Sequence, residues 1–311
     1  MGACKTPPGL IFGGFKAILS PGEGSTRMME SRNRLKTAKR VVIKVGTSTL
    51  THDSGRVDLA RMDRLCRAVS DQMNQGRDVV LVTSGAIGVG LARLRMKEKP
   101  KEMREKQAVA AVGQCELMSL YSRLFSEYGY VVGQVLLTRG DVDDLQAREN
   151  ARNTFECLLE KEVLPIVNEN DTVSTVEILH NGSFGDNDTL SAIVAALVGA
   201  DLLILLSDID GLFDRDPRQD PDARLIGFVK RIDDDVAASA GGAGSRRGTG
   251  GMKTKIEAAR IATSAGVAMV IANGRDPGVI DDILQGHPVG TLFAAQPRVA
   301  EAAGEAAALG K

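Results

Sequence analysis

Short runs of aliphatic residues recur along this chain, and segments with helical spacing separate each run from the next. Within a run both alternating faces are largely apolar, which is typical of strands buried inside a parallel sheet. The runs occupy residues 41–45, 79–82, 131–137, 163–167, 202–206 and 267–271. Strands that alternate with helices predict an α/β fold, namely a three-layer αβα sandwich with a mainly parallel sheet.

The helical segments carry their apolar residues on one face. In residues 57–75, for example, Met62, Leu65 and Val69 share a face, and Gly76 follows where a helix-ending glycine is expected. A helix with one apolar face is stable only when that face is covered. We therefore expect the helices to pack against the two faces of the sheet.

The two ends of the chain lack this periodicity. Residues 1–38 combine prolines, glycines and a basic run, which favours a disordered or loosely attached extension. The ordered domain is expected at residues 39–295, followed by an alanine-rich tail, residues 296–311, that forms a frayed helix. The first six residues also match a myristoylation pattern in which Cys4 could be a second acylation site. A plain tail or an organelle-targeting segment are the alternatives.

The composition excludes several classes of protein. With 39 basic and 40 acidic residues the net charge is -1, so no overall field attracts nucleic acid, and no nucleic-acid partner is expected. The four cysteines match neither a disulfide framework nor a metal site, and three histidines make a zinc enzyme or a histidine-assisted nucleophile a poor fit. No apolar run reaches the length of a membrane span. A reducing, cytoplasmic location is expected.

Polar or charged residues stand at the ends of four predicted strands. Because the carboxyl ends of parallel strands meet at one edge of a sheet, these residues are expected to line a common ligand site. Plain structural explanations stay open: a lysine reaching solvent at the sheet margin, a serine that caps a helix, or a polar turn. The residues concerned are Lys44, Ser84, Gly85, Asn168, Asp171, Ser207 and Asp208.

A glycine-rich stretch, residues 248–251, runs directly into a predicted helix that begins with lysines. Glycine backbone can turn its N–H groups toward a phosphate, and the positive end of the helix dipole lies at the same place. The stretch therefore predicts a phosphate site, with a flexible connector as the alternative. It matches neither the Walker sequence nor the dinucleotide fingerprint. The residues of this predicted site are Thr249, Gly250, Gly251, Met252, Lys253, Thr254 and Lys255.

Another predicted helix begins at Asn187 or Asp188, directly after Asp186. Acidic residues in a first helical turn stabilise the helix dipole, so the two aspartates could be ordinary caps. Two carboxylates beside a phosphate site could equally order lysines or magnesium. The pattern leaves both interpretations open.

Several motifs, taken in order, resemble those of the amino acid kinase family. They span residues 42–48, 82–86, 167–171, 185–188 and 248–255, and residues 110–114 and 133–138 agree as well. The resemblance covers residues 39–295. It implies the amino acid kinase fold and, from the branch that matches best, ATP-dependent phosphorylation of the side-chain carboxylate of L-glutamate, the first step of proline synthesis.

The resemblance also implies roles for particular residues. Lys44 would act on the acceptor and the transferring phosphoryl group, and Lys255 on ATP, with Asp186 and Asp188 orienting lysines, substrate or metal. The family's glutamate-binding positions correspond to Ser84, Gly85, Asn168, Asp171 and Asn187. Its nucleotide-binding positions correspond to Lys44, Ser207, Asp208 and residues 249–255. ATP and Mg²⁺ are the implied cofactors, with no metal ligand assigned.

The implied partners are L-glutamate, ATP, proline as a feedback inhibitor and further copies of the chain in a homo-oligomer. Neither the PUA domain of many bacterial members nor a fused reductase is expected, so a separate reductase would receive the labile acyl phosphate. Two alternatives stay open. One is a relative that acts on acetylglutamate, aspartate, carbamate or UMP, and the other is a catalytically silent sensor of glutamate or proline.

Overall fold

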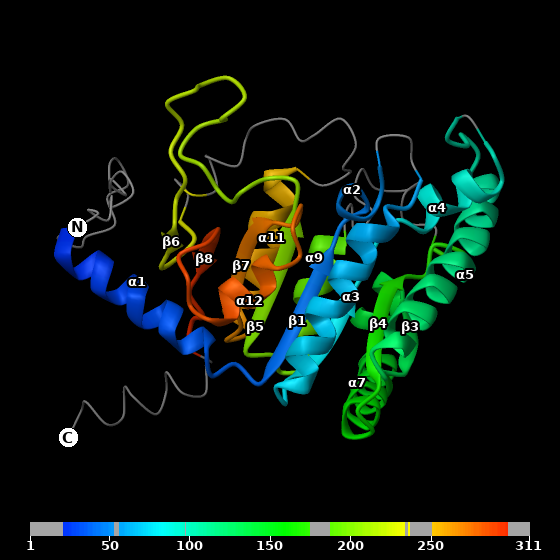
Figure 1. Cartoon of the computed structure of the whole chain (residues 1–311), viewed down its shortest axis with the longest axis horizontal. Coiled ribbons are helices and arrows are strands. Elements are labelled where there is room, and N and C mark those ends of the chain that lie inside the picture. The colour runs from blue at the N-terminus through cyan, green and yellow to red at the C-terminus, as the bar shows by residue number, and fades with distance from the viewer. Residues whose placement is uncertain are drawn as a thin grey trace, which may run out of the picture.

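The computed structural model of the chain describes residues 21–52, 56–96, 98–174, 187–233, 236 and 251–297. These residues contain an eight-stranded sheet in the order β3-β4-β2-β1-β5-β7-β8-β6 (Figure 1). All neighbouring strands are parallel except β7 and β8. The prediction of a mainly parallel sheet is confirmed. The strands are β1 (Arg40–Val45), β2 (Asp78–Val82), β3 (Val132–Leu137), β4 (Leu164–Glu169), β5 (Leu202–Ser207), β6 (Phe228–Val229), β7 (Ala268–Asn273) and β8 (Thr291–Phe293).

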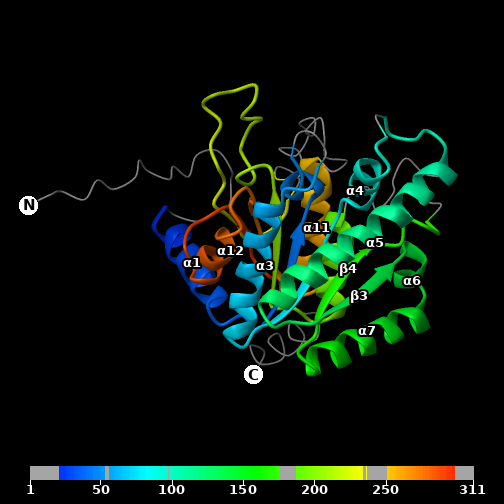
Figure 2. The same cartoon turned by 45° about the vertical axis from the view of Figure 1, so that its right-hand side comes forward.

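Helices cover both faces of this sheet, which completes the three layers (Figure 2). One face packs against α3 (Leu59–Asn74), α5 (Met103–Glu127) and α12 (Val279–Leu284). The other face packs against α7 (Leu145–Glu160), α9 (Asn187–Leu197) and α11 (Met252–Ser264). The other helices of the described residues are α1 (Pro21–Leu35), α2 (Thr47–Leu50), α4 (Ala86–Arg93) and α6 (Arg139–Asp143).

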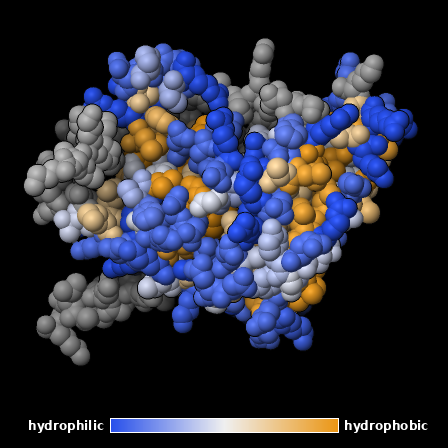
Figure 3. Space-filling model, viewed as in Figure 1, coloured by the Kyte–Doolittle hydropathy of each residue, from blue (hydrophilic) through white to orange (hydrophobic). Residues whose placement is uncertain are grey.

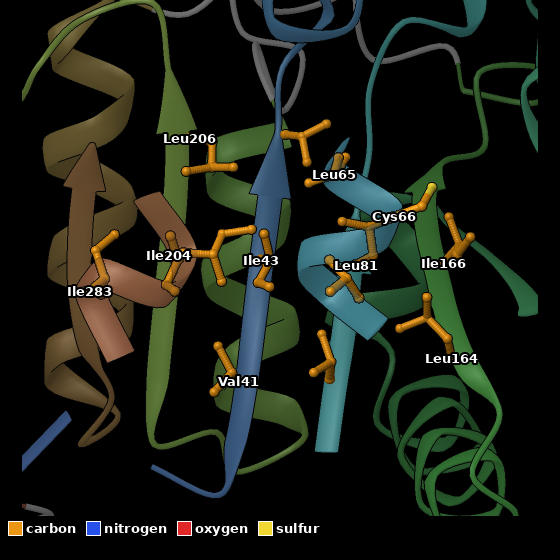
Figure 4. Close-up of a cluster of buried hydrophobic side chains, with 14 of the residues drawn as sticks. Val41, Ile43, Leu65, Cys66, Leu81, Leu164, Ile166, Ile204, Leu206 and Ile283 are labelled. Carbon is orange, nitrogen blue, oxygen red and sulfur yellow. The ribbon is translucent and has the colours of Figure 1, made fainter. Parts of the chain in front are cut away.

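Alternate residues of the central strand supply the two halves of the core. Val41 and Ile43 of β1 belong to the cluster under α3 and α12, whereas Val42 belongs to the cluster under α9 and α11. Figure 4 shows the first cluster, in which Ile43 lies between Ile204 of β5 and Leu81 of β2. Each such side chain is fully buried and contributes about 1.5–3 kcal/mol of hydrophobic free energy. Hydrophilic residues of the covering helices face outward, with hydrophobic residues visible between them (Figure 3).

Helix α1 corrects the expectation of a loosely attached extension for residues 21–35. Met28, Arg32 and Leu35 share one face of this helix and are buried, and Leu35 belongs to the core cluster. The helix packs beside α12 (Figure 2). Sequence periodicity conceals this face because one of its three buried members is charged. Residues 1–20 and 298–311, with their predicted roles, lie outside the described residues.

The guanidinium of Arg32 anchors α1 through backbone carbonyls. It donates to the carbonyl oxygens of Gly227 at 3.1 Å, His287 at 3.2 Å, Val289 at 2.6 Å and Gly290 at 2.9 Å. Burial lowers the pKa of Arg32 to about 10, so the group stays charged at neutral pH. One buried cation therefore ties the N-terminal helix to the segments around β8 and to the residue before β6.

Replacing Arg32 should destabilise the fold without changing the polar residues at the strand ends. In Arg32→Met, four carbonyls lose a charged donor, so we expect the free energy of unfolding to fall by about 3 kcal/mol. Urea denaturation measures this change. Arg34→Met, an exposed arginine of the same helix, is the control and should change the free energy of unfolding by less than about 0.5 kcal/mol. Equal effects of the two substitutions would contradict the anchoring role.

None of the helices in the described part of the chain has the length and apolar character that a membrane span requires. Among the cysteines that the structure describes, Cys66 is buried in the core, and Cys115 and Cys157 are exposed.

Candidate active site

The polar clusters meet at the edge formed by the carboxyl ends of the parallel strands. This edge lies at the top of Figure 1, where the arrowhead of β1 points toward α2. Helix α9 packs against β1, β2, β4 and β5, so its N-terminus lies where their ends converge. Helix α11 packs beside α9. The chain thus brings two helix starts to four strand ends, as the connectivity of parallel α/β units requires.

At the centre of this edge, one buried carboxylate holds two lysines. Asp188 Oδ1 lies 2.6 Å from Lys44 Nζ, and Asp188 Oδ2 lies 2.9 Å from Lys255 Nζ. All three side chains are nearly inaccessible, with relative exposures of 3 % for Lys44, 0 % for Asp188 and 6 % for Lys255. We call these three side chains the lysine–aspartate triplet. The sequence left open whether Asp188 caps its helix or orders lysines or magnesium. The contacts in the structure support the ordering of lysines.

Local structure places each member of the triplet. Lys44 is the second-to-last residue of β1, Asp188 is the second residue of α9, and Lys255 lies in the first turn of α11. Thr254 adds a hydroxyl whose one proton lies within hydrogen-bonding reach of two acceptors, Asp188 Oδ2 at 3.2 Å and the Gly251 carbonyl oxygen at 2.9 Å. The alternative of a lysine that reaches solvent at the sheet margin is therefore wrong for Lys44.

Glycine leaves space beside the first lysine. Gly46 follows β1, and a Cβ at this position would lie 3.5 Å from Lys44 Nζ. The backbone of Gly46 has an ordinary negative φ of -90°, so its conformation does not require glycine. Any side chain longer than a methyl group at this position would extend from a Cβ that already contacts the Lys44 ammonium.

The triplet is a strongly ionised arrangement. Burial alone would raise the pKa of Asp188, but the positive charges of Lys44 and Lys255, and their hydrogen bonds, outweigh this effect and hold the pKa well below its usual range. The carboxylate is therefore ionised at neutral pH. The three side chains together carry one positive charge, which suits them to an anionic group.

The depressed pKa predicts how stability depends on pH. A carboxylate whose folded pKa lies below its unfolded value stabilises the fold above the unfolded pKa, and this contribution disappears as pH falls toward the folded pKa. The difference in unfolding free energy between wild type and Asp188→Asn should therefore stay constant from pH 7 to about 5 and shrink below about pH 4. Urea titrations at each pH measure it. A difference that grew on acidification would contradict the ionised triplet.

A second cluster, made of amides and hydroxyls, lies next to the triplet. Asn187 Nδ2 donates to Asn168 Oδ1 at 2.7 Å, to Ser84 Oγ at 3.0 Å and to the carbonyl oxygen of Thr83. Asn187 is the residue before Asp188, so one helix start supplies both clusters. We call Thr83, Ser84, Asn168 and Asn187 the amide cluster.

Backbone geometry shapes the turn that carries Ser84. Gly85 has φ +102°, a left-handed conformation that favours glycine, and it precedes α4 as the N-cap residue. No side chain caps α4, and Ser84 instead accepts a hydrogen bond from Asn187. The interpretation of Ser84 as an ordinary helix cap is therefore wrong. Asp171 lies in the half-buried turn after β4, beyond Asn168 and Glu169.

The remaining predicted residues lie toward β5 and α11. Ser207, the buried last residue of β5, donates to the carboxylate of exposed Asp208 at 3.2 Å. Gly251 is the N-cap of α11, Met252 is half-buried, and Lys253 is exposed. Asp186, Thr249 and Gly250 lie outside the described residues.

Sequence reasoning missed two residues that support the amide cluster from α5. Gln114 accepts a hydrogen bond from Asn168, and the buried hydroxyl of Tyr121 lies 2.9 Å from Thr83 Oγ1. Residues 110–114 contributed to the family resemblance, but that signal carried no role for Gln114. Tyr121 shares its helix with buried Leu117 and Leu120, and this apolar pattern predicts a core residue with no role for its hydroxyl.

The described residues do not form a carboxylate cage for a metal ion. Within them, no group of three or more histidine, cysteine, aspartate or glutamate side chains converges. Both carboxylate oxygens of Asp188 already contact lysine ammonium groups.

Comparison with known proteins agrees with this geometry. A model of the amino acid kinase family matches residues 39–273. The chain belongs to the amino acid kinase family. Relatives that are 51–55% identical over 85% of the chain are named glutamate 5-kinase, and the resemblance predicted from the motifs is confirmed. The chain is therefore a kinase.

Three of these relatives illustrate the degree of similarity. The glutamate 5-kinase of Clostridium perfringens (strain 13 / Type A) is 55% identical over 265 residues, which cover 85% of this chain and 98% of that protein. That of Listeria innocua is 53% identical, covering 85% and 96%. That of Moorella thermoacetica is 55% identical over 264 residues, covering 85% of this chain and 69% of that protein.

Solved structures support the fold. The UMP kinase of Bacillus anthracis superposes with a TM-score of 0.56 at 17% identity, covering 84% of this chain and 97% of that one. An isopentenyl phosphate kinase superposes with a TM-score of 0.57 at 17% identity, covering 82% and 100%. The amino acid kinase fold predicted from the sequence is confirmed.

Proposed function

We propose that this chain transfers the terminal phosphoryl group of ATP to the side-chain carboxylate of L-glutamate, giving L-glutamyl 5-phosphate in the first step of proline biosynthesis. Relatives that are 51–55% identical over 85% of the chain carry the name glutamate 5-kinase. The lysine–aspartate triplet is the structural feature that best supports phosphoryl transfer. It holds two buried positive charges where strand ends and helix starts meet.

The chemistry requires little of the protein beyond charge and position. A carboxylate is ionised at neutral pH and attacks phosphorus without a general base, so no catalytic histidine or cysteine is needed. The attacking and leaving oxygens must be held in line, and negative charge on the transferring group must be stabilised. Lys44 would contact the acceptor side of that group, and Lys255 the ATP side. Asp188 keeps both ammonium groups in place.

The amide cluster would form the acceptor side of the site. Asn187 and Asn168 contribute amides, and Ser84 contributes a hydroxyl. The cluster lies close to Lys44 because Asn187 is followed in the chain by Asp188, which contacts Lys44. Polar groups at the carboxyl ends of buried strands can fix the orientation of a small polar substrate. We assign Ser84, Gly85, Asn168, Asp171 and Asn187 to glutamate.

The other end of the site would hold ATP. We assign Ser207, Asp208 and residues 249–255 to the nucleotide. Lys255 lies in the first turn of α11 and contacts Asp188, so the N–H groups at the start of this helix would lie close to phosphates bound at the triplet. Mg²⁺ would neutralise charge on the phosphates when it is bound with ATP. Asp186 is proposed to act beside Asp188.

Further parts of the proposal concern regulation and partners. Proline, a close chemical relative of glutamate, is proposed to inhibit at the acceptor side, and a homo-oligomer in the cytoplasm is the expected working form. Because an acyl phosphate hydrolyses readily, a separate reductase is proposed to consume the product promptly.

An assay that offers several acceptors tests the function. Purified protein is given Mg-ATP with glutamate, acetylglutamate, aspartate or UMP, and ADP formation is followed while hydroxylamine traps any acyl phosphate. We expect turnover and hydroxamate formation with glutamate. Turnover with acetylglutamate in place of glutamate would contradict the proposal. If none of the four acceptors were phosphorylated, the result would indicate a silent sensor instead.

A further inference from the structure

Gln114 is a deeply buried polar side chain whose amide is only half used by the fold. It lies in the middle of α5 with 8 % of its surface exposed. Its Oε1 accepts a hydrogen bond from Asn168 Nδ2 at 2.8 Å. Its buried Nε2 has no hydrogen-bond partner among the described residues. Buried amides normally satisfy both ends, so this glutamine calls for an explanation.

A second buried glutamine shows the ordinary pattern. Gln72 of α3 is 1 % exposed, and its Oε1 accepts from Arg77 at 2.9 Å while its Nε2 donates to Asp281 at 3.4 Å. Gln72 thereby ties its helix to neighbouring segments with both ends of its amide. Gln114, by contrast, makes its one hydrogen bond to Asn168 of the amide cluster.

The hydrogen bonds of Asn168 explain what that one bond does. Asn168 Oδ1 accepts from Asn187 Nδ2 at 2.7 Å and from the backbone N–H of Glu169 at 2.9 Å. Two donors therefore fix the oxygen end, and the NH₂ end must find an acceptor in a buried environment. Gln114 Oε1 is that acceptor. In the orientation that lets Asn168 Oδ1 accept from Asn187, the Asn168 NH₂ group would be a buried donor without an acceptor if Gln114 were absent.

Helix α5 is well suited to hold this acceptor rigidly. Next to Gln114, Gly113 lies so close to α4 that an added Cβ would be 1.7 Å from the Ala86 carbonyl oxygen. Seven residues further along α5, on the same face, the hydroxyl of Tyr121 contacts Thr83 Oγ1. The helix thus supports the ends of both β2 and β4, where the amide cluster lies.

We propose that Gln114 is a positioning residue for the acceptor: through Asn168 it fixes the amide of Asn187, and thereby sets the affinity for the amino acid substrate. The inference rests on the proposed assignment of Asn168 and Asn187 to glutamate. Among the described residues, the hydrogen bond of Gln114 goes to Asn168, and none joins it to the lysine–aspartate triplet or to α11. Its loss should therefore affect the acceptor and leave ATP binding unchanged.

Steady-state kinetics of Gln114→Met test the proposal. This variant keeps the length and apolar stem of the side chain but removes the acceptor for Asn168. We expect KM for glutamate to rise by about tenfold, which corresponds to the loss of one buried hydrogen bond, and KM for ATP to change less than about twofold. An unchanged KM for glutamate, or an equal rise in both KM values, would overturn the proposal.

Two further variants separate positioning from folding. Gln72→Met makes the same change at a buried glutamine near the end of α3, whose partners are Arg77 and Asp281. It should lower Tm and leave KM for glutamate and KM for ATP unchanged. If Gln114→Met does not fold, Gln114→Asn is used, because its shorter side chain cannot reach Asn168 but keeps the amide. The same split in KM is expected for Gln114→Asn, and its absence would overturn the proposal.

The experiment also distinguishes failure of the inference from failure of the proposed function. Wild-type protein that phosphorylates an acid other than glutamate would refute the proposed substrate. KM for that acid would then be compared between wild type and Gln114→Met. A selective rise would support the positioning role, and an unchanged value would overturn it.

Discussion

Asp188→Asn should lower kcat by about 1,000-fold, the largest effect expected of any single substitution in this chain. Asparagine keeps the shape of the side chain but removes the negative charge that lies 2.6 Å from Lys44 and 2.9 Å from Lys255. Two buried ammonium groups then repel each other without the carboxylate between them, and neither is held in position for the transferring phosphoryl group. Rates of ADP formation at saturating glutamate and ATP measure the change.

The same substitution should also destabilise the fold. Removing one partner from a buried ion pair typically costs about 3–5 kcal/mol, because the remaining charge is left buried. Kinetic measurements are therefore made at a temperature where urea denaturation shows the variant to be folded. Asp143→Asn is the control, because Asp143 makes an exposed i,i+4 pair with Arg139. Its kcat should match that of wild type. A folded Asp188→Asn variant with near wild-type kcat would exclude the triplet from catalysis.

Lys255→Met should lower kcat by roughly 100-fold or more while KM for glutamate changes little. Methionine retains most of the length of lysine and fits the buried position at the start of α11, but it carries no charge. The transferring group would lose one of two cationic contacts, whereas Lys44 would keep its contact with Asp188. The amide cluster is built from other elements, so acceptor binding should be preserved.

Arg260→Met provides the comparison for this variant. Arg260 is an exposed cationic residue of the same helix, so its loss tests whether any positive charge on α11 matters. We expect wild-type kcat in Arg260→Met. Wild-type turnover in Lys255→Met would remove Lys255 from the mechanism, and equal losses in both variants would indicate a general electrostatic effect.

The sequence was informative wherever a local pattern reports burial directly. Apolar runs such as residues 202–206 predicted strands, and β5 is buried at every position. Alternation of strands and helices leaves few possible connections, so it also predicted that strand ends would meet at one edge. For the same reason Lys44 and Ser84 could be placed at that edge before any contact was known.

What only the tertiary structure decided is which side chains contact one another there. From the sequence, Asp188 could have capped its own helix or bound lysines. The choice depends on how α9 and α11 pack together and on the position of Lys44 along β1. Arg32 of α1 and Gln114 of α5 were invisible to periodicity, since a polar residue on a buried face weakens the pattern that would reveal the face. Local sequence therefore determines the elements and the edge, and packing between distant elements determines the lysine–aspartate triplet and the amide cluster.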